Sequence, residues 1–398
     1  MLIGVVGKPN CGKSTFFKAL TLADVLIANY PFATIKPNHG AGHAKVDCAD
    51  TDFGVQCNPR EGFCINHNRF VPVELIDVAG LVPGAHEGKG LGNQFLDDLR
   101  QADALIHVID CSGGTNERGE VVASGTNDPA NDIRFLETEL DMWYLGILNK
   151  TWEKFAKQVQ YEHKEPYKEI AKQFSGLRVT ESLAKETIAK LGLNSADTTK
   201  WSPEDLKKFA IELRIATKPM LIAANKIDVP GAKENFERLK GEFPNYIIVA
   251  CSAESEVALK EANRKGLISY MPGEGDFKII NEQAMNDRQK MALEFIRKNV
   301  LEKFGSTGVQ DAINTAVFKL LNYIAVFPVA IKLADQYGRI LPDCFLVPHG
   351  TTALSFAFRV HSDIGNGFIR AIDVKRKLTV GKDYPLKHRD VVEIISSK

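Results

Sequence analysis

The chain has no excess of either charge sign and no long apolar segment. Its 50 Lys and Arg residues balance 50 Asp and Glu residues, so the formal net charge is zero. A neutral chain has no global electrostatic attraction to nucleic acids or membranes. No apolar run reaches the length that crosses a bilayer, and Met1 leads directly into a strand-like run without a charged leader. We therefore expect no membrane partner and no signal peptide.

The length and composition indicate a multi-domain globular protein. A chain of 398 residues is long enough for two or three domains. Its apolar fraction of 44% and charged fraction of 25% are ordinary for globular chains, so it can bury sizeable cores.

A glycine-rich loop follows the first apolar run, residues 2–6, and precedes a helical pattern over 16–20. It contains G-x-x-x-x-G-K-S, and strand, loop and helix in this order are the context that a phosphate loop requires. Backbone N–H groups and the helix N-terminus favour phosphate oxygens there. Lys13 is expected to reach the β- and γ-phosphates, and Ser14 to bind Mg²⁺. The residues expected to bind nucleotide in this loop are Gly7, Lys8, Pro9, Asn10, Cys11, Gly12, Lys13, Ser14 and Thr15.

A second motif indicates which base is bound. Asn225-Lys226-Ile227-Asp228 follows the apolar run 220–224, and therefore lies at the carboxyl end of a strand, where open α/β sheets bind ligands. In N-K-x-D the Asp carboxylate accepts hydrogen bonds from guanine N1–H and the 2-amino group, a donor pair that adenine lacks. Ser252 and Ala253 follow another apolar run and match the loop that backs the guanine. A site for GTP implies the cytosol, where thiols stay reduced, so we expect a cytoplasmic protein without a disulfide framework.

The sensors of metal and γ-phosphate are expected between these motifs. Asp77 and Gly80 form D-x-x-G after a strand-like run, and Thr34 is the candidate switch threonine and second Mg²⁺ ligand after Ser14. Leu81 stands where Ras-like proteins place a water-orienting Gln. His86 is a candidate for that task, although an ordinary loop histidine is an equal alternative. The catalytic candidates are Lys13, Thr34 and His86.

Three segments resemble one family of GTPases. The phosphate loop with Pro9-Asn10 and the stretches 29–38 and 77–93 are similar to the Obg-related GTPases, specifically the YchF subfamily. Residues 345–352 and 390–394 resemble the TGS domain that ends these proteins. The resemblance implies a ribosome- or RNA-associated switch. It also implies a site for K⁺ beside the phosphates, held by Asn10. Many YchF members carry a glutamate-ended variant of N-K-x-D and prefer ATP, whereas this chain has Asp228, which favours GTP.

The expected architecture is α/β: a P-loop GTPase fold with an inserted helical subdomain and a C-terminal α+β β-grasp (TGS) domain. Apolar residues recur at helical spacing over 132–160, and Ser202-Pro203 begins a further helix. Short strand-like runs alternate with turns after Phe327. We expect the first part of the G domain at 1–127, the helical insertion at 128–217, the second part with following helices at 218–326, and the TGS-like domain at 327–398.

The function expected from these motifs is hydrolysis of GTP to GDP and phosphate by a monomeric molecular switch. A nucleotide-dependent metabolic enzyme and a nucleotide-binding scaffold with negligible turnover remain alternatives. Residues 370–398 hold eight Lys or Arg against four Asp or Glu, so this end is the best electrostatic footprint for RNA, or simply a solvated surface. Its basic residues are Lys375, Arg376, Lys377, Lys387 and Arg389.

Three cysteines gather in one loop-like stretch. Cys48, Cys57 and Cys64, with His43 before them and His67 behind, could hold Zn²⁺ through three thiolates and an imidazole. Their irregular spacing lacks a C-x-x-C knuckle. Buried thiols without a metal are therefore the simpler expectation.

Overall fold

The computed structural model describes residues 1–22, 38–78, 98–150, 152–330, 333–335 and 337–397. They form two compact units, each made of two chain segments. Unit 1 comprises Met1–Phe17 and Leu75–Ala253, and unit 2 comprises Lys18–Glu74 and Glu254–Lys398. No helix among the described residues is long and apolar enough to cross a membrane.

Unit 1 is built on a parallel sheet. Its strands are β1 (Leu2–Val6), β5 (Ala104–Asp110), β6 (Met220–Asn225) and β7 (Ile247–Ala250), in that order, with the end of β4 (Asn68–Asp77) beside β1. Every residue of β1, β5 and β6 is buried, as expected for a parallel sheet covered on both faces. The carboxyl ends of β1, β5 and β6 therefore bring the phosphate loop, Asp110 and Asn225 to one edge.

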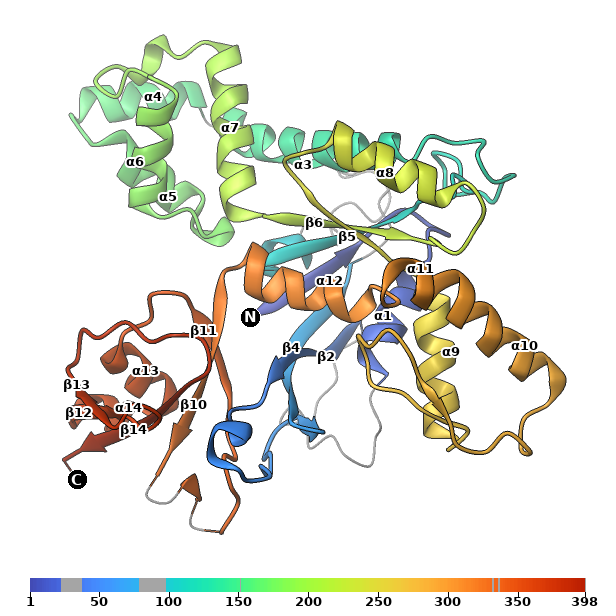
Figure 1. Cartoon of the computed structure of the whole chain (residues 1–398). Helices are drawn as coiled ribbons and strands as arrows, with labels where there is room; N and C mark the ends of the chain where they lie inside the picture. The colour runs from blue at the N-terminus through green and yellow to red at the C-terminus, as the bar shows by residue number, and fades with distance from the viewer. Residues whose placement is uncertain (23–37, 79–97, 151, 331–332, 336, 398) are drawn as a thin grey trace. The chain divides into compact units, whose positions relative to one another are not determined.

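Helices of unit 1 follow β5 in a long insertion before β6. They are α3 (Ala130–Asn149), α4 (Trp152–Tyr161), α5 (Pro166–Gln173), α6 (Glu181–Lys190) and α7 (Pro203–Thr217), with short 3₁₀ turns at Ser175–Leu177 and Thr198–Lys200. Figure 1 shows α4, α5 and α6 gathered beyond the ends of α3 and α7. The helical pattern over 132–160 is confirmed, and the structure divides it between α3 and α4. The expected start of α7 is confirmed by a capping box between Ser202 and Asp205. After β6, α8 (Ala232–Glu242) leads to β7.

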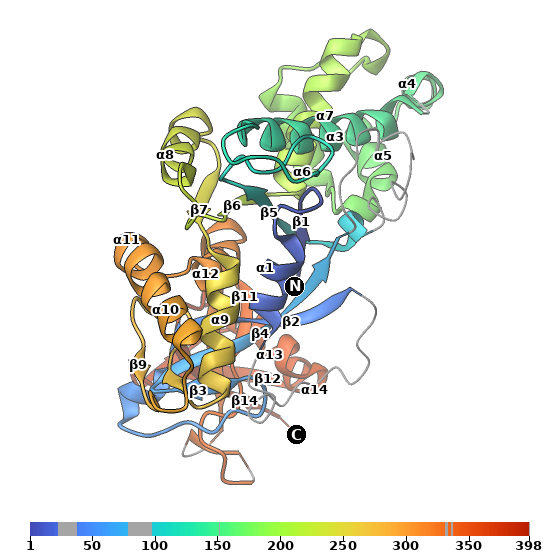
Figure 2. The same cartoon turned by 90° about the vertical axis from the view of Figure 1, so that its right-hand side faces the viewer.

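The first half of unit 2 joins an antiparallel ribbon to a group of helices. Helix α1 (Lys13–Thr21) enters it, followed by β2 (His39–Asp47), a 3₁₀ turn η1 (Ala49–Phe53), β3 (Phe63–Ile65) and most of β4. Helices α9 (Ala253–Arg264) and α10 (Asp287–Ile296) lie side by side, with buried Leu259, Leu293 and Ile296 in one apolar cluster (Figure 2). The remaining elements are β8 (Ile268–Ser269), β9 (Lys278–Ile279), a π-helical segment Arg297–Leu301, α11 (Glu302–Phe304), α12 (Val309–Thr315) and a π-helical segment Ala316–Leu320.

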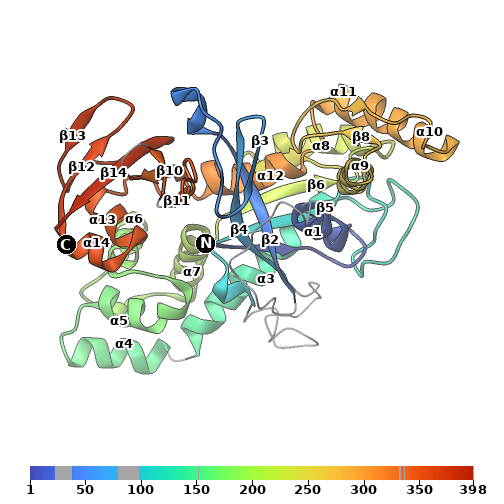
Figure 3. The same cartoon turned by 90° about the horizontal axis from the view of Figure 1, so that it is seen from below.

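The C-terminal part of unit 2 is a five-stranded mixed sheet with two helices. The strand order is β11-β10-β14-β12-β13, with β10 and β14 parallel and the other pairs antiparallel. Helices α13 (Ala353–Val360) and α14 (Ser362–Asn366) lie beside this sheet, and Phe356 of α13 is part of its apolar core (Figure 3). The strands are β10 (Tyr323–Val329), β11 (Phe345–Pro348), β12 (Phe368–Asp373), β13 (Leu378–Val380) and β14 (Asp390–Ser396).

Two sequence-based boundaries differ from the structure in this part. The apolar spacing predicts a helix over 310–323 and a first strand-like run at 329–333, but the helical segment ends at Leu320 and the strand begins at Tyr323. Asn322 between them has φ 52°, a left-handed conformation that a helix cannot continue through. The mixed sheet itself and helix α13 agree with the β-grasp expectation. The four domain boundaries given above stay predictions.

Candidate functional site

The glycines of the phosphate loop lie where no side chain fits. A Cβ on Gly7 would lie 2.5 Å from the carbonyl oxygen of Val108. Gly12 has φ +93°, and a Cβ there would lie 2.2 Å from Nδ2 of Asn225. The loop therefore packs directly on β5 and on the end of β6, which explains why two glycines are needed.

Asn225 joins the three sequence motifs through one buried amide. Its Nδ2 donates to the carbonyl oxygen of Cys11 at 3.0 Å, and its Oδ1 accepts from the backbone N–H of Ala253 at 3.0 Å. The phosphate loop, N-K-x-D and the Ser252-Ala253 loop thus lie together at the carboxyl edge of the sheet. The Cys11 thiol is packed inside, and burial raises its pKa to about 12, so this residue contributes through its backbone.

Lys226 forms a second contact between N-K-x-D and the phosphate loop. Its ammonium group donates to the carbonyl oxygen of Asn10 at 2.9 Å and lies 2.8 Å from Oδ2 of Asp110. Asp110 is buried, and its other oxygen accepts from the Ser112 hydroxyl at 2.6 Å. The sequence analysis did not single out Asp110. Its position as an acid at the carboxyl end of a buried strand was the signal that could have indicated it.

Lys13 forms an ion pair with Asp77. Asp77 ends β4, and Lys13 begins α1, so the ion pair joins the D-x-x-G carboxylate to the phosphate-loop lysine. Ser14, the expected Mg²⁺ ligand, is exposed next to this pair. Binding of phosphate would have to exchange the Asp77 carboxylate for phosphate oxygens around the Lys13 ammonium group.

The side chain of Lys8 faces the protein interior instead of the nucleotide side. Its Nζ donates to Oδ1 of Asp132 and to the carbonyl oxygen of Thr115, both at 2.8 Å. Burial raises the pKa of the Asp132 carboxyl to about 6, and the hydrogen bond from Lys8 opposes this shift. Lys8 was expected among the nucleotide-binding residues, and only its backbone N–H remains for that role.

Residues 112–125 fold onto the phosphate loop. The side-chain amide of Asn10 donates to the carbonyl oxygen of Gly119 at 2.8 Å, and a Cβ on Gly119 would lie 2.8 Å from Cβ of Pro9. Thr115 and Val121 form an antiparallel bridge within this segment. The glycines of this segment favour a flexible loop, but in the structure it supports Pro9 and Asn10.

The remaining expected site residues differ in burial, and four of the residues discussed with them lie outside the described residues. Asp228 is half-buried, and its carboxylate has no hydrogen-bond partner among the described residues. Ser252 and Ala253 are buried. Thr34, Gly80, Leu81 and His86 lie outside the described residues.

Comparisons with known proteins agree with this geometry. The family model of 50S ribosome-binding GTPases matches residues 2–138, the TGS domain model matches 336–396, and the model for the G4-motif domain of Obg-like YGR210-like GTPases matches 223–330. An uncharacterized GTP-binding protein of Methanocaldococcus jannaschii is 49% identical, covering 100% of this chain and 99% of that protein. The chain belongs to the Obg-related, YchF-like GTPases.

Further relatives extend the comparison. The crystal structure of a GTP-binding protein from Pyrococcus horikoshii is 41% identical, with a TM-score of 0.80 and 100% of both chains covered. A protein of Pasteurella multocida called ribosome-binding ATPase YchF is 29% identical, covering 92% of this chain and 86% of that protein. As a member of this family, the chain is a GTP-hydrolysing enzyme with a P-loop GTPase fold, a helical insertion and a C-terminal TGS domain.

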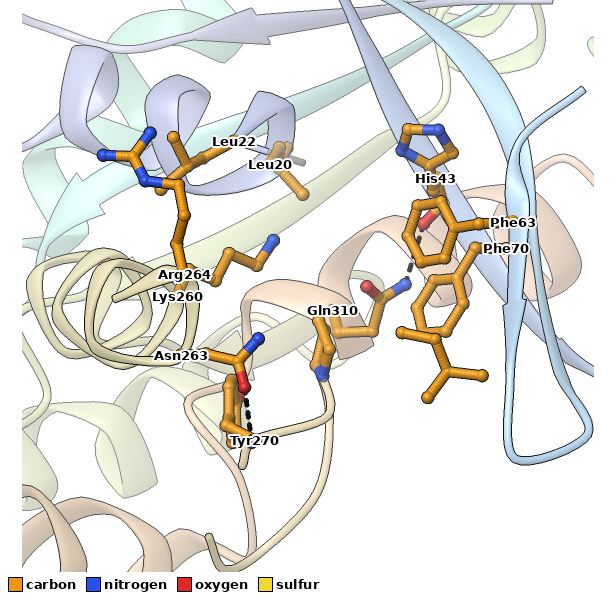
Figure 4. Close-up of a pocket in the computed structure, with 12 residues that line it drawn as sticks. Leu20, Leu22, His43, Phe63, Phe70, Lys260, Asn263, Arg264, Tyr270 and Gln310 are labelled. Atoms are coloured by element: carbon orange, nitrogen blue, oxygen red, sulfur yellow. Dashed lines mark hydrogen bonds between the residues drawn. The ribbon is translucent and has the colours of Figure 1, made fainter. Parts of the chain in front are cut away.

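A pocket elsewhere in this GTPase involves none of the residues expected to bind nucleotide. It lies in unit 2 between α9, β2, β3 and β4, with stacked Phe63 and Phe70 on one side and Lys260 on the other (Figure 4). His43 lies against Phe63, and its carbonyl oxygen accepts from the Gln310 amide at 2.9 Å. Burial and nearby Lys260 lower the pKa of His43 to about 4, so this imidazole is neutral at pH 7.

Proposed function

We propose that this GTPase holds GTP on the loop 7–15, recognises guanine with Asp228, and acts as a ribosome-associated switch. One observation carries the assignment of the base: the Asn225 amide joins the phosphate loop to the Ser252-Ala253 loop, with Asp228 three residues further along. A carboxylate without a protein partner at this edge matches the paired N1–H and 2-amino donors of guanine. Adenine would leave it desolvated and unpaired.

The roles in hydrolysis follow from the charges at the loop. Lys13 would stabilise the β- and γ-phosphates, and Ser14 would bind Mg²⁺, which neutralises charge between those phosphates. Asp77, released from Lys13, would face the metal directly or through water. Thr34 and the Gly80 amide would contact the γ-phosphate and lose this contact when it is hydrolysed. Leu81 cannot orient water, so His86 or a partner would supply that function.

A monovalent cation is a second way to supply charge. The Asn10 amide nitrogen is already used on Gly119, which fixes the orientation of the side chain and leaves its oxygen as an acceptor. We propose that this oxygen helps to hold K⁺ beside the phosphates. Hydrolysis should then be faster in K⁺ than in Na⁺ at equal ionic strength, and Asn10→Ala should remove the difference. Equal rates in both salts would leave Asn10 with its contact to Gly119 alone.

The proposal of a ribosome partner rests on the names of relatives and on the basic C-terminal end. Several basic residues of that end are already engaged in contacts within the protein. Lys375 pairs with Asp52, Arg376 with Asp373, and Arg389 binds the backbone of residues 47 and 48. Lys377 and Lys387 are exposed and have no ion-pair partner among the described residues. These two are therefore the residues of the basic set best suited to RNA phosphates. We further propose that the protein is cytoplasmic and monomeric.

Phosphate release from GTP, measured with and without ribosomes, tests the proposal. Lys13→Ala should remove most turnover, and Lys18→Ala should not. Lys18 is a matched control because it lies on the same helix and forms only an exposed pair with Glu261. Wild-type turnover in Lys13→Ala would show that the loop is not the active site. Absence of turnover under every condition would favour the nucleotide-binding scaffold, and phosphate transfer to a small molecule would favour the metabolic enzyme.

A further inference from the structure

Three thiols and one carboxylate converge in unit 2, in the segment between β2 and β4. One ligand atom from each of Cys48, Asp50, Cys57 and Cys64 lies within 4.8 Å of all the others. The Sγ atoms of Cys48 and Cys57 are 3.5 Å apart. Zn–S bonds of about 2.3 Å in a tetrahedron place sulfurs about 3.8 Å from one another. The four atoms are thus close enough together for one ion to contact all of them.

Hydrogen bonds around Asp50 hold its carboxylate in place. Oδ2 accepts from the backbone N–H of Cys57 at 3.0 Å, and Oδ1 lies 3.0 Å from Nδ1 of His67. The backbone N–H of Cys48 in turn donates to the carbonyl oxygen of His67 at 2.7 Å. Such outer contacts orient the ligands of protein metal sites. His67 therefore supports Asp50, a residue that the sequence pattern did not single out, and His43 lies in the pocket of Figure 4 instead.

A buried arginine supplies the charge that such a site requires. Arg69 is 1% exposed, and its Nη1 lies 3.8 Å from Sγ of Cys57. Its other contacts are the carbonyl oxygens of Leu341 and Pro342, and no carboxylate of the described residues pairs with it. Three thiolates, one carboxylate and one divalent ion carry a net charge of −2. Arg69 would compensate part of that charge, and the site would give the buried guanidinium its counterion.

We propose that Cys48, Asp50, Cys57 and Cys64 bind one structural Zn²⁺. Three sulfurs and one oxygen select zinc or another thiophilic divalent ion over Mg²⁺ or Ca²⁺. Four protein ligands close the coordination shell, which is the arrangement of structural sites. Cys57 and Cys64 also line a surface cleft with Gln56 and Arg339, which gives the ion an entry path.

By ordering the segment 48–67, the metal would stabilise the contacts of this segment with the C-terminal sheet. This segment has little regular structure beyond η1 and β3. Its backbone N–H groups of Asn58 and Arg60 donate to the carbonyl oxygens of Ile340 and Pro342 at 2.8 and 2.9 Å. Cys48 and Cys57 share an apolar cluster with Phe327 and other C-terminal residues. A bound ion at the centre of this segment would make folding of the TGS domain and of the 48–67 segment one event.

The test measures metal in the full-length protein, purified under reducing conditions without chelator. Elemental analysis should give about one zinc per chain for the wild type, and replacement by Co²⁺ should give thiolate charge-transfer bands. Cys64→Ser, at the least buried of the three thiols, should lose the zinc. Cys344→Ser is the matched control, because Cys344 packs near the site but is not among its four ligand residues, and it should keep the zinc. Removal of zinc by a chelator should increase proteolysis within 48–67.

Two results would overturn the proposal. The first is a wild-type protein that holds no zinc and whose Co²⁺ form shows no thiolate bands. This result does not depend on the folding of any variant. The other is a count of free thiols two short of the seven cysteines under non-reducing denaturation, with Cys48 and Cys57 found in a disulfide. Loss of zinc from Cys344→Ser together with retention in Cys64→Ser would also contradict it.

Discussion

The ammonium group of Lys226 lies 2.8 Å from a carboxylate oxygen of Asp110, and this carboxylate is fully buried. The pair joins the end of β5 to the guanine motif after β6. Because Lys226 also binds the Asn10 carbonyl oxygen, the pair fixes the distance between base and phosphate sites. We therefore propose that Asp110 positions the residues that bind the nucleotide.

Substitution of Asp110 tests this relationship. Asp110→Ala leaves Lys226 without its counterion, and we expect affinity for GDP to fall about tenfold, or about 1.4 kcal/mol. Asp128→Ala, which removes an exposed pair with Arg238 and a hydrogen bond from the backbone N–H of Ala130, should change the affinity little. Calorimetric titration of GDP measures both. An Asp110→Ala protein with wild-type affinity would mean that the pair does not position the site.

The ion pair between Lys13 and Asp77 predicts opposite effects on binding and turnover. Asp77→Asn releases Lys13, so GDP affinity without Mg²⁺ should stay unchanged or rise. Turnover with Mg²⁺ should fall at least about tenfold, because the metal loses a carboxylate in its shell. Fluorescent nucleotide binding with and without Mg²⁺, beside phosphate release, separates the two effects. Parallel loss of Mg²⁺-free binding and turnover would contradict this account.

Buried His107 predicts acid sensitivity of unit 1. Burial, with nearby Lys8, lowers the pKa of His107 to about 3 from 6.5. The folded state then binds fewer protons than the unfolded state, so stability present above pH 6.5 is lost as pH falls towards 3. The slope is at most about 1.4 kcal/mol per pH unit for one group. Asp132 acts with the opposite sign between pH 3.8 and about 6, because burial raises its pKa.

The measurement is therefore the difference between variants. Chemical denaturation of His107→Leu should depend less steeply on pH below 6.5 than that of the wild type. His163→Gln, at an exposed position, should follow the wild type. Equal steepness in all three proteins would show that His107 is not the group that titrates.

The basic C-terminal end predicts a specific effect on ribosome binding. The double variant Lys377→Glu and Lys387→Glu should weaken co-sedimentation with ribosomes and reduce its salt dependence, because phosphate contacts release counterions. Lys240→Glu on α8 is the control. Truncation at Phe327 is a poorer test, because it removes Val391 from a core cluster that also contains Phe327, Cys48 and Ala49. The truncated chain would therefore lose part of the core of unit 2 as well as the basic end. Unchanged binding by the double variant would make the helical insertion the leading candidate for docking.

Local motifs carried most of what the sequence could predict. Strand, glycine loop and helix fix the phosphate loop because neighbouring residues determine its geometry, and N-K-x-D follows a strand that can only end at the same edge of the sheet. Helix α7 was predictable because its capping residues are adjacent in the chain. In each case the physical cause lies within a few residues.

Contacts between distant residues were not predictable. Lys8 and Asp132 are 124 positions apart, and nothing near either residue indicates that they pair. Asp50 joins the three cysteines only because η1 turns it toward them, and the irregular cysteine spacing hides that geometry. The end of the π-helical segment at Leu320 depends on the left-handed backbone of Asn322, for which asparagine is only a weak signal.

The most direct test of the central claim compares GTP with ATP on the full-length protein. Calorimetry should show GTP binding at least about a thousandfold more tightly than ATP, because Asp228 pairs with donors that only guanine presents. Asp228→Asn should lose this preference and gain affinity for xanthosine triphosphate, whose 2-oxo group accepts from the new amide. Equal affinities of the wild type for GTP and ATP would contradict the assignment of Asp228, and with it the account of a guanine-specific switch.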